Sequence, residues 1–199
     1  MFYQPAQRDH GLAYDPFKAI VAPRPIGWIS SLDAEGRTNL APYSFFNAIS
    51  ANPHMVMFSS AGWKDSVANI AATAEFVCNL TTWDLRDAMN ESSAALAHET
   101  SEFDTTGLKT APSTLVKPPR VADAVAALEC KLLKQEELVS LDGRSAGHWV
   151  TFGEVVGVHI DERFITDGRF DTAKAKTIAR CGYMDYAVVE SVFAMERPG

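Results

Sequence analysis

Residues 22–66 read APRPIGWISSLDAEGRTNLAPYSFFNAISANPHMVMFSSAGWKDS. Apolar, strand-like runs alternate in this stretch with short groups of hydroxyl and amide side chains, and the cations Arg24 and Lys64 lie beside them. A hydrophobic core needs none of these polar groups, because burying a polar group costs free energy unless it is hydrogen-bonded. A phosphorylated, planar, aromatic ligand needs all of them. The stretch therefore predicts strands that lead into a ligand site.

Segments rich in β-branched and aromatic residues, bounded by turn residues, predict the strands. They cover residues 26–32, 38–50, 55–58, 75–80, 128–133, 149–160 and 187–195. In the fifth segment the apolar side chains alternate with Glu129 and Lys131, which predicts a strand that is buried on one face only. Pro42 inside the second segment indicates a strand edge or a bulge.

Helical periodicity is limited to short segments. Val67 and Ile70 lie on one face of a predicted helix over 65–74, with Asp65 or Ser66 as its N-cap. The other expected elements are short helices over 82–95 and 172–179 and a loop over 98–120. Six or more strands without regular β-α-β alternation predict a mainly β fold, an antiparallel, six-stranded Greek-key barrel with short helices.

The composition limits the class of protein. The 199 residues are 47% hydrophobic and 22% charged, which is typical of one globular domain, expected to span residues 1–199. A net charge of −7 argues against a nucleic-acid-binding protein, which needs a basic face. There is no run of about 18 apolar residues, as a membrane helix requires, and no signal peptide is evident. We therefore expect no membrane association and a cytoplasmic location.

Several common catalytic and binding motifs are absent. The sequence contains no GxGxxG or GxxxxGKS/T loop, no GxSxG nucleophile elbow and no HExxH zinc motif. The five histidines are scattered, so no metal site is expected. The three cysteines form no CxxC pair, and Cys78 and Cys130 lie in apolar runs, so both are expected to be buried thiols rather than a disulfide.

Polar side chains gather where the predicted strands end and the first helix begins. These candidates are Ser30, Ser31, Ser59, Ser60, Lys64, Asp65 and Ser66. If three strand ends and the helix start meet at one barrel rim, hydroxyls and free helix amides would hold a phosphate, and Arg24 or Lys64 would neutralise it. Backbone amides near residues 41–44 would bond the edge of a flat heterocycle.

Each candidate also has an ordinary structural explanation. Ser31, Ser59 and Ser60 are typical turn formers at strand ends. Asp65 has the position of an ordinary helix cap, so a structural role is the preferred interpretation for these four residues. A functional role is preferred for Arg24, which lies between two prolines beside an apolar strand.

The aromatic residues also allow two interpretations. Phe45 and Phe46 are adjacent, so one should face the core and one the opposite side, and Phe45 is the preferred core residue. Trp28 and Trp63 suit either core or interface packing or the lining of a ligand pocket.

Taken together and in order, several segments resemble the flavin reductase-like family. They are PRPIGWISS (23–31), GRTNLAPYSFFNAIS (36–50), MVMFS (55–59), KDSVANI (64–70), EFVCN (75–79), ALEC (127–130) and GEVV (153–156). The resemblance covers most of the chain and implies an FMN-binding split barrel, usually a homodimer with FMN near the subunit interface. It also implies an enzyme that transfers a hydride from NAD(P)H to flavin. If the flavin dissociates, it would supply a partner monooxygenase.

The resemblance assigns the flavin contacts motif by motif. The ring contacts fall on Asn39, Ala41, Pro42, Tyr43 and Ser44, with Phe46 and Asn47 beside the ring. The ribityl chain and phosphate fall to Ser59, Lys64, Asp65, Ser66 and Asn69, with Arg24 contributing from the Pro-Arg-Pro bend. The segment Arg180-Cys181-Gly182 corresponds to a flavin or interface loop.

A second segment bears on the nicotinamide. GHWVTFGEV (147–155) resembles a family segment whose histidine lies near the place where nicotinamide stacks on flavin, which makes His148 the candidate catalytic residue. Relatives carry an aspartate where this chain has Gly147. That difference favours a second hypothesis, a flavin-binding electron carrier without its own nicotinamide site. A third is an interaction module that has kept the barrel and lost the ligand.

Overall fold

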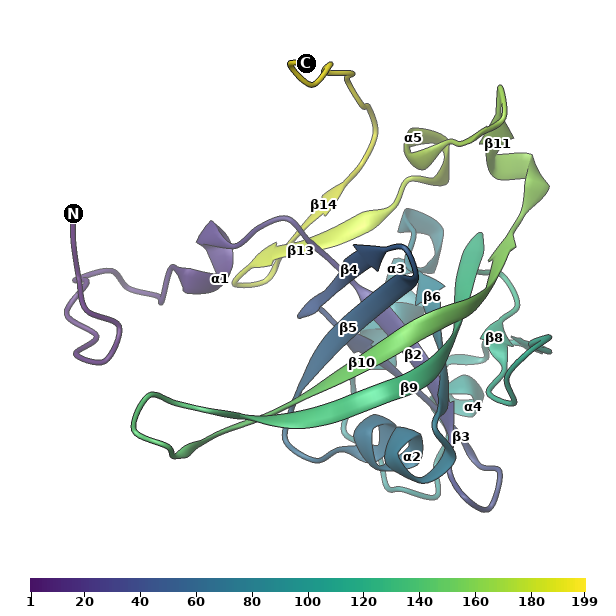
Figure 1. Ribbon diagram of the computed structural model, residues 1–199, viewed down its shortest axis with the longest axis horizontal. Coiled ribbons are helices and arrows are strands. Elements are labelled where there is room, and N and C mark those ends of the chain that lie inside the picture. Colours follow the sequence, from purple (N-terminus) through teal and green to yellow (C-terminus); the bar gives the residue numbers. More distant parts are fainter.

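The computed structural model describes residues 1–199, and its main feature is a curled antiparallel sheet in the strand order β3-β2-β6-β9-β10-β5-β4 (Figure 1). Its strands are β2 (Gly27–Leu32), β3 (Thr38–Tyr43), β4 (Phe46–Ala51), β5 (His54–Ala61), β6 (Glu75–Leu80), β9 (Ala126–Val139) and β10 (Ser145–Ile160). The edge strands β3 and β4 are joined by only two residues, Ser44 and Phe45. So short a link brings the two edges together, which closes the sheet into a barrel that is split at this point.

Short helices surround the barrel. They are α1 (Phe17–Ile20), α2 (Asp65–Thr73), α3 (Arg86–Glu91) preceded by the 3₁₀ turn η1 (Trp83–Leu85), α4 (Glu102–Thr106), η2 (Glu162–Phe164) and α5 (Thr172–Ala175). Helix α2 packs against β2, β3 and β9, and its Val67 and Ile70 are completely buried. None of the helices has the length and apolarity needed to cross a lipid bilayer.

The barrel interior is filled by aromatic and β-branched side chains. Phe58 lies at its centre, with its ring 4.6 Å from that of Tyr43 and 5.9 Å from that of Phe76. Cys78 and Cys130 are buried, as expected, and neither forms a disulfide. A second cluster, which contains Trp28, attaches α3 and α4 to the outside of the barrel.

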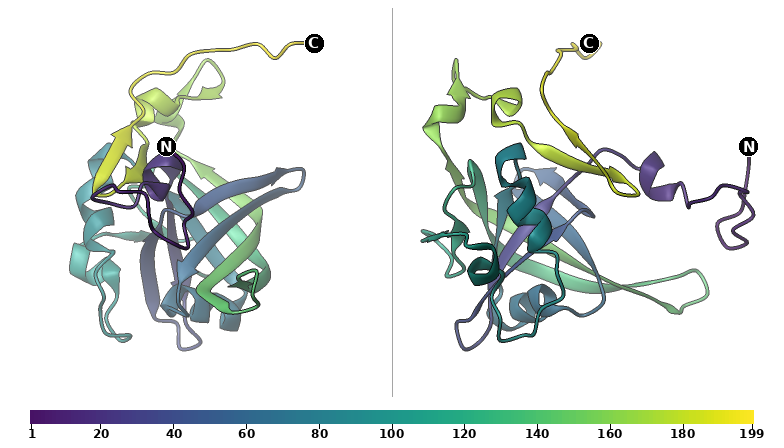
Figure 2. Two further views of the ribbon diagram at one scale, coloured as in Figure 1. Left: turned by 90° about the vertical axis from the view of Figure 1, so that its left-hand side faces the viewer. Right: turned by 180° about the vertical axis from the view of Figure 1, so that it is seen from behind.

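Three small sheets complete the fold. The first contains β1 (Arg24–Pro25), β13 (Ile178–Gly182) and β14 (Asp185–Val188). The other two pair β7 (Thr110–Ala111) with β8 (Arg120–Val121) and β11 (Ile165–Thr166) with β12 (Arg169–Phe170). The N-terminal segment with α1 and the tip of the β9–β10 hairpin extend from the same side of the barrel (Figures 1 and 2).

The predicted mainly β, antiparallel barrel is confirmed, with seven strands in its sheet rather than six. The expected strand over 38–50 is two strands, because the chain turns at Ser44 and Phe45. The helix expected over 82–95 ends at Glu91, and the loop expected over 98–120 contains α4 and two short strands. The expected helix over 172–179 lasts only four residues, because strand β13 begins at Ile178.

Two further expectations were wrong. Helix α2 begins after Lys64, which is extended and makes no side-chain cap, so neither Asp65 nor Ser66 is the N-cap. Glu129 is completely buried, although the alternation in its strand placed it on the exposed face. Its carboxylate accepts hydrogen bonds from the amides of residues 114–116 and pairs with His159. These partners come from segments distant in sequence.

Candidate functional site

Three hollows meet where β3 passes into β4. The helix pocket, of about 540 Å³, lies between the end of β3, the start of α2 and the segment 92–97. The arm pocket, of about 890 Å³, lies between the N-terminal segment, β4, β5 and the β9–β10 hairpin. The cationic hollow, of about 380 Å³, lies between β13, β14 and α3. Pro42 lines the first and third, and Ser44 lines the second and third, so the predicted site segment lies at their junction.

The start of α2 faces the helix pocket with free donors. The first hydrogen bond of the helix is donated by the amide of Ala68 to the carbonyl of Lys64. The three preceding amides therefore have no acceptor within the helix, and no side chain caps them. Lys64 also lines the pocket, and its ammonium makes no ion pair. This is the arrangement that binds an anion at a helix N-terminus.

Polar side chains line the inner wall of the helix pocket. Asn39 donates from Nδ2 to the Oγ of Ser66 over 2.8 Å. The hydroxyl of Tyr43 lies near the hydroxyls of Ser60 and Ser66, but it is buried without a hydrogen bond of good geometry. Burial raises the pKa of Tyr43 above its ordinary value, so this hydroxyl keeps its proton and remains a free donor.

Two carboxylates also line the helix pocket. Asp65 is paired with His98, whose Nδ1 lies 2.7 Å from its Oδ1. Glu102 accepts a 2.8 Å hydrogen bond from the amide of Leu40. Burial, with a smaller contribution from the charge of Asp65, raises the pKa of Glu102 above its ordinary value. Each carboxylate thus has its own partner, and Lys64 is left unpaired.

The arm pocket collects a different set of predicted residues. His148 lies there with its Nδ1 3.4 Å from the Oγ of Ser59, and its ring centroid is 6.2 Å from that of Phe45. Phe46, Asn47 and Arg24 line the same hollow. Because adjacent side chains of a strand point to opposite faces, Ser59 faces His148 while Ser60 faces the barrel interior.

The profile described as "Flavin reductase like domain" matches residues 21–174. The chain belongs to this flavin reductase like family. An uncharacterized protein of Aquifex aeolicus is 30% identical over 182 residues, covering 88% of this chain and 89% of that protein.

Solved structures of similar proteins agree with the family. Nitrilotriacetate monooxygenase component B from Bacillus cereus is 29% identical, with a TM-score of 0.89, and the match covers 98% of each chain. The 2-nitrobenzoate 2-nitroreductase from Pseudomonas fluorescens is 26% identical, with a TM-score of 0.86, covering 100% of this chain and 96% of that one.

Some residues that the family resemblance or the strand pattern assigned to the ligand are buried within the fold instead. Ser30, Ser31 and Asn69 line none of the three hollows and are almost completely buried. The Oγ of Ser30 donates to the carbonyl of Pro119, and Asn69 donates to the Oγ of Ser31 over 3.2 Å. Their polar groups therefore connect elements of the fold. The candidate residues that were expected at one barrel rim do not all meet at one site.

The assignment of the two adjacent phenylalanines is reversed. Phe46 packs against the barrel core as well as lining the arm pocket, whereas Phe45 lines the arm pocket and does not pack against that core. The reason is Gly27: a side chain there would place its Cβ 2.5 Å from Cδ2 of Phe46, so the glycine makes room for this ring. Trp28 is a core residue whose Nε1 donates to Ser92, and Trp63 lines the helix pocket.

Sequence reasoning missed several lining residues. The segment 92–97 and Glu102 close the helix pocket, although no motif marks them. Lys18, Tyr183, Met184 and Tyr186 line the cationic hollow together with Arg180, and only Arg180 belonged to a segment noted in advance. No group of three or more His, Cys, Asp or Glu side chains is arranged to hold a metal ion.

Proposed function

We propose that this flavin reductase like protein binds FMN and uses NAD(P)H to reduce it. The observation that carries the proposal is the helix pocket. It combines free amides at the start of α2, an unpaired lysine and a buried tyrosine hydroxyl without a partner. A buried donor without an acceptor is unusual in a folded protein and points to a missing polar ligand.

The residues present fit the phosphate of FMN. The amides that begin α2 would donate to its oxygens, and Lys64 would neutralise part of its charge. Ser66 and Asn39 would contact the ribityl hydroxyls from the pocket wall. Asp65 would orient His98 rather than bind the ligand, because the two are already paired.

The flat ring would lie against the end of β3. Strand β3 is an edge strand, so backbone groups on its outer side have no partner strand. The amide of Leu40 already uses this side, since it donates to Glu102. Residues two apart on a strand point the same way, so the carbonyl of Pro42 and the amide of Ser44 are available to the polar edge of the ring.

His148 would position the nicotinamide from the arm pocket, next to the ring. FMN, when bound, supplies the electron-transfer chemistry, so the protein needs to orient the partners rather than provide a nucleophile. Ser59 contacts His148 and would limit the orientation of its ring. The walls of the arm pocket are largely apolar and would exclude water from this side.

The assembly and the electron acceptor also belong to the proposal. The arm pocket is bordered by the N-terminal segment and the tip of the hairpin, which extend from the barrel, so a second copy of the chain would close it. The likeness to a monooxygenase component B supports a partner monooxygenase that receives reduced flavin.

FMN titration tests the assignment of the phosphate and the ribityl chain to the helix pocket. We expect Lys64→Ala combined with Ser66→Ala to weaken FMN binding by about 2–4 kcal/mol, roughly a 30- to 1000-fold higher Kd, because a charge-assisted and a neutral hydrogen bond are lost. Lys109→Ala removes an exposed lysine that lines none of the three hollows and should leave the Kd unchanged. An unchanged Kd in the double variant would contradict the assignment.

The second candidate function is a flavin-binding electron carrier without a nicotinamide site. Gly147, in place of the aspartate expected before His148, favours it. NADH and NADPH oxidation by the FMN-loaded protein distinguishes the two functions. Turnover above that of free FMN supports the reductase, and turnover equal to free FMN supports the carrier.

A further inference from the structure

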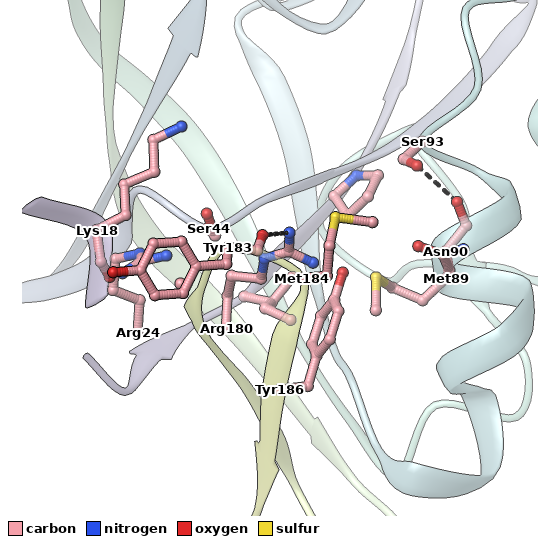
Figure 3. Close-up of a pocket in the computed structure, with 13 residues that line it drawn as sticks. Lys18, Arg24, Ser44, Met89, Asn90, Ser93, Arg180, Tyr183, Met184 and Tyr186 are labelled. Atoms are coloured by element: carbon pink, nitrogen blue, oxygen red, sulfur yellow. Dashed lines mark hydrogen bonds between the residues drawn. The ribbon is translucent and has the colours of Figure 1, made fainter. Parts of the chain in front are cut away.

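The cationic hollow lies beside the proposed flavin site but is not part of it. Figure 3 shows Lys18, Arg24 and Arg180 around this hollow, with Tyr183 and Tyr186 projecting from the β13–β14 hairpin. Its wall includes Pro42 and Ser44, the residues proposed to meet the polar edge of the flavin ring. A molecule in the hollow would therefore contact a flavin bound at that edge.

The charge of this hollow is opposite to that of the protein. Three cations line it and no carboxylate does, although the chain has a net charge of −7. Lys18 makes no ion pair, and Arg180 makes one hydrogen bond, to the carbonyl of Tyr183. Arg24 is 6% exposed; its Nη1 donates to the carbonyls of Lys18, Val21 and Cys181, and only its Nε has no hydrogen-bond partner. Arg24 thus ties the N-terminal segment to β13, whereas Lys18 and Arg180 line the hollow without a carboxylate partner and favour an anionic ligand.

The hollow also offers aromatic surface. The guanidinium of Arg180 lies 4.4 Å from the ring centroid of Tyr186. Beyond Met89 and Tyr186 the hollow continues into a second one of about 350 Å³, where Arg86 lies 4.0 Å from the ring centroid of Trp83 and is paired with Asp87, which also lines this second hollow. Alternating rings and guanidinium groups favour a flat ring that carries a negative charge.

We propose that the cationic hollow binds the anionic group of an aromatic second substrate, a ring that bears a carboxylate or a phosphate. The term "second substrate" rests on the proposed function, in which flavin is the first substrate. The binding of an anion in the hollow does not depend on that function. Two sources supply the chemistry: the adenosine diphosphate part of a nicotinamide dinucleotide, and a free aromatic acid.

Calorimetric titration with two matched pairs of probes tests the proposal. ADP is compared with adenosine, and benzoate with benzamide, on the protein with and without FMN. We expect at least one anion to bind about tenfold or more tightly than its uncharged partner, because a charge-assisted hydrogen bond contributes that much. Preference for ADP identifies the dinucleotide as the source, and preference for benzoate identifies an aromatic acid.

Variants locate the binding. Arg180→Gln and, separately, Lys18→Gln should each weaken the favoured anion about tenfold, whereas Arg169→Gln, an exposed arginine on β12 outside the hollow, should not. Equal binding of charged and uncharged probes, no binding of either anion, or anion binding that neither variant weakens would overturn the proposal. Anion binding in a protein that fails to bind FMN would overturn the proposed function alone.

Discussion

A single side chain, Glu129, connects the barrel to the segment that precedes β8. Its carboxylate is buried on β9 and accepts hydrogen bonds from the amides of residues 114–116, at 2.7 Å for Thr114 and 2.5 Å for Leu115. His159 on β10 pairs with it from the other side. Burial alone would raise the pKa of Glu129, but the hydrogen bonds from His159 and these amides outweigh it and lower the pKa below 4.5.

Glu129→Gln should lower the free energy of unfolding at pH 7 by about 2–3 kcal/mol, because a buried carboxylate with several donors is replaced by a neutral group. A lowered folded-state pKa means that the ionised form stabilises the fold. Its contribution is complete above pH 4.5 and decreases as the pH falls through the folded-state value. Denaturant unfolding at several pH values should therefore show a difference that shrinks in acid.

The control for this change lies on the same strand. Glu136 is exposed and paired only with Lys134, so Glu136→Gln should change the stability by less than about 0.5 kcal/mol. A Glu129→Gln effect that stayed constant between pH 7 and acid pH would contradict the role of its charge.

Strand β10 contains two glycines, Gly153 and Gly157, whose surroundings differ. A Cβ at Gly153 would lie 2.4 Å from Cζ of Phe76, whereas one at Gly157 would have its nearest neighbour, Cβ of Glu129, at 3.4 Å. The ring of Phe76 thus occupies the space of a missing side chain at Gly153. Both glycines have the extended backbone of the 16-residue strand β10. A difference between their alanine variants would therefore come from side-chain packing and not from backbone conformation.

Gly153→Ala should destabilise the protein by about 1–3 kcal/mol, because the methyl group must displace a packed ring. Gly157→Ala should cost clearly less, since its surroundings leave ordinary contact distances. Thermal unfolding of the two variants measures the difference. Equal transition temperatures would show that β10 adjusts its position instead.

In the whole molecule, the barrel carries extensions with exposed apolar side chains. Phe17 and Ile20 in the N-terminal segment are more than half exposed, and Leu138 on the hairpin is 42% exposed. All three line the arm pocket. Exposed apolar patches of this kind mark interaction surfaces, which is the physical basis for proposing a homodimer.

We expect sedimentation equilibrium to show a dimer, and Leu138→Asp to weaken dimerisation by about 1.5–3 kcal/mol, because a leucine that the proposed interface would bury is replaced by a charge. Leu115→Asp provides the control, since Leu115 is 53% exposed and does not line the arm pocket. A wild-type protein that remains monomeric with FMN bound would contradict the proposed interface.

Local patterns in the sequence predicted much of this architecture. The strand over 75–80 and the helix at 65–74 were predicted almost to the residue, because each has strong periodicity and clear turn residues at its ends. Three features were not predicted from the sequence: the strand order, the turn at Ser44 and Phe45 that separates β3 from β4, and the burial of Glu129. They depend on partners far away in the chain.

Local residue patterns were sufficient to specify the class of fold, the family and the polar residues at the start of α2, since these depend on neighbouring residues and on ordered motifs. The distribution of the polar residues among the hollows follows from the three-dimensional packing. Lys64 and Ser66 lie in the helix pocket, and Ser59 lies with His148 in the arm pocket. Ser30 and Ser31 are buried. The same packing assembles the cationic hollow, whose members come from both ends of the chain. The physical reason is that a strand's alternation sets which side chains share a face, whereas the curl of the sheet sets which faces meet.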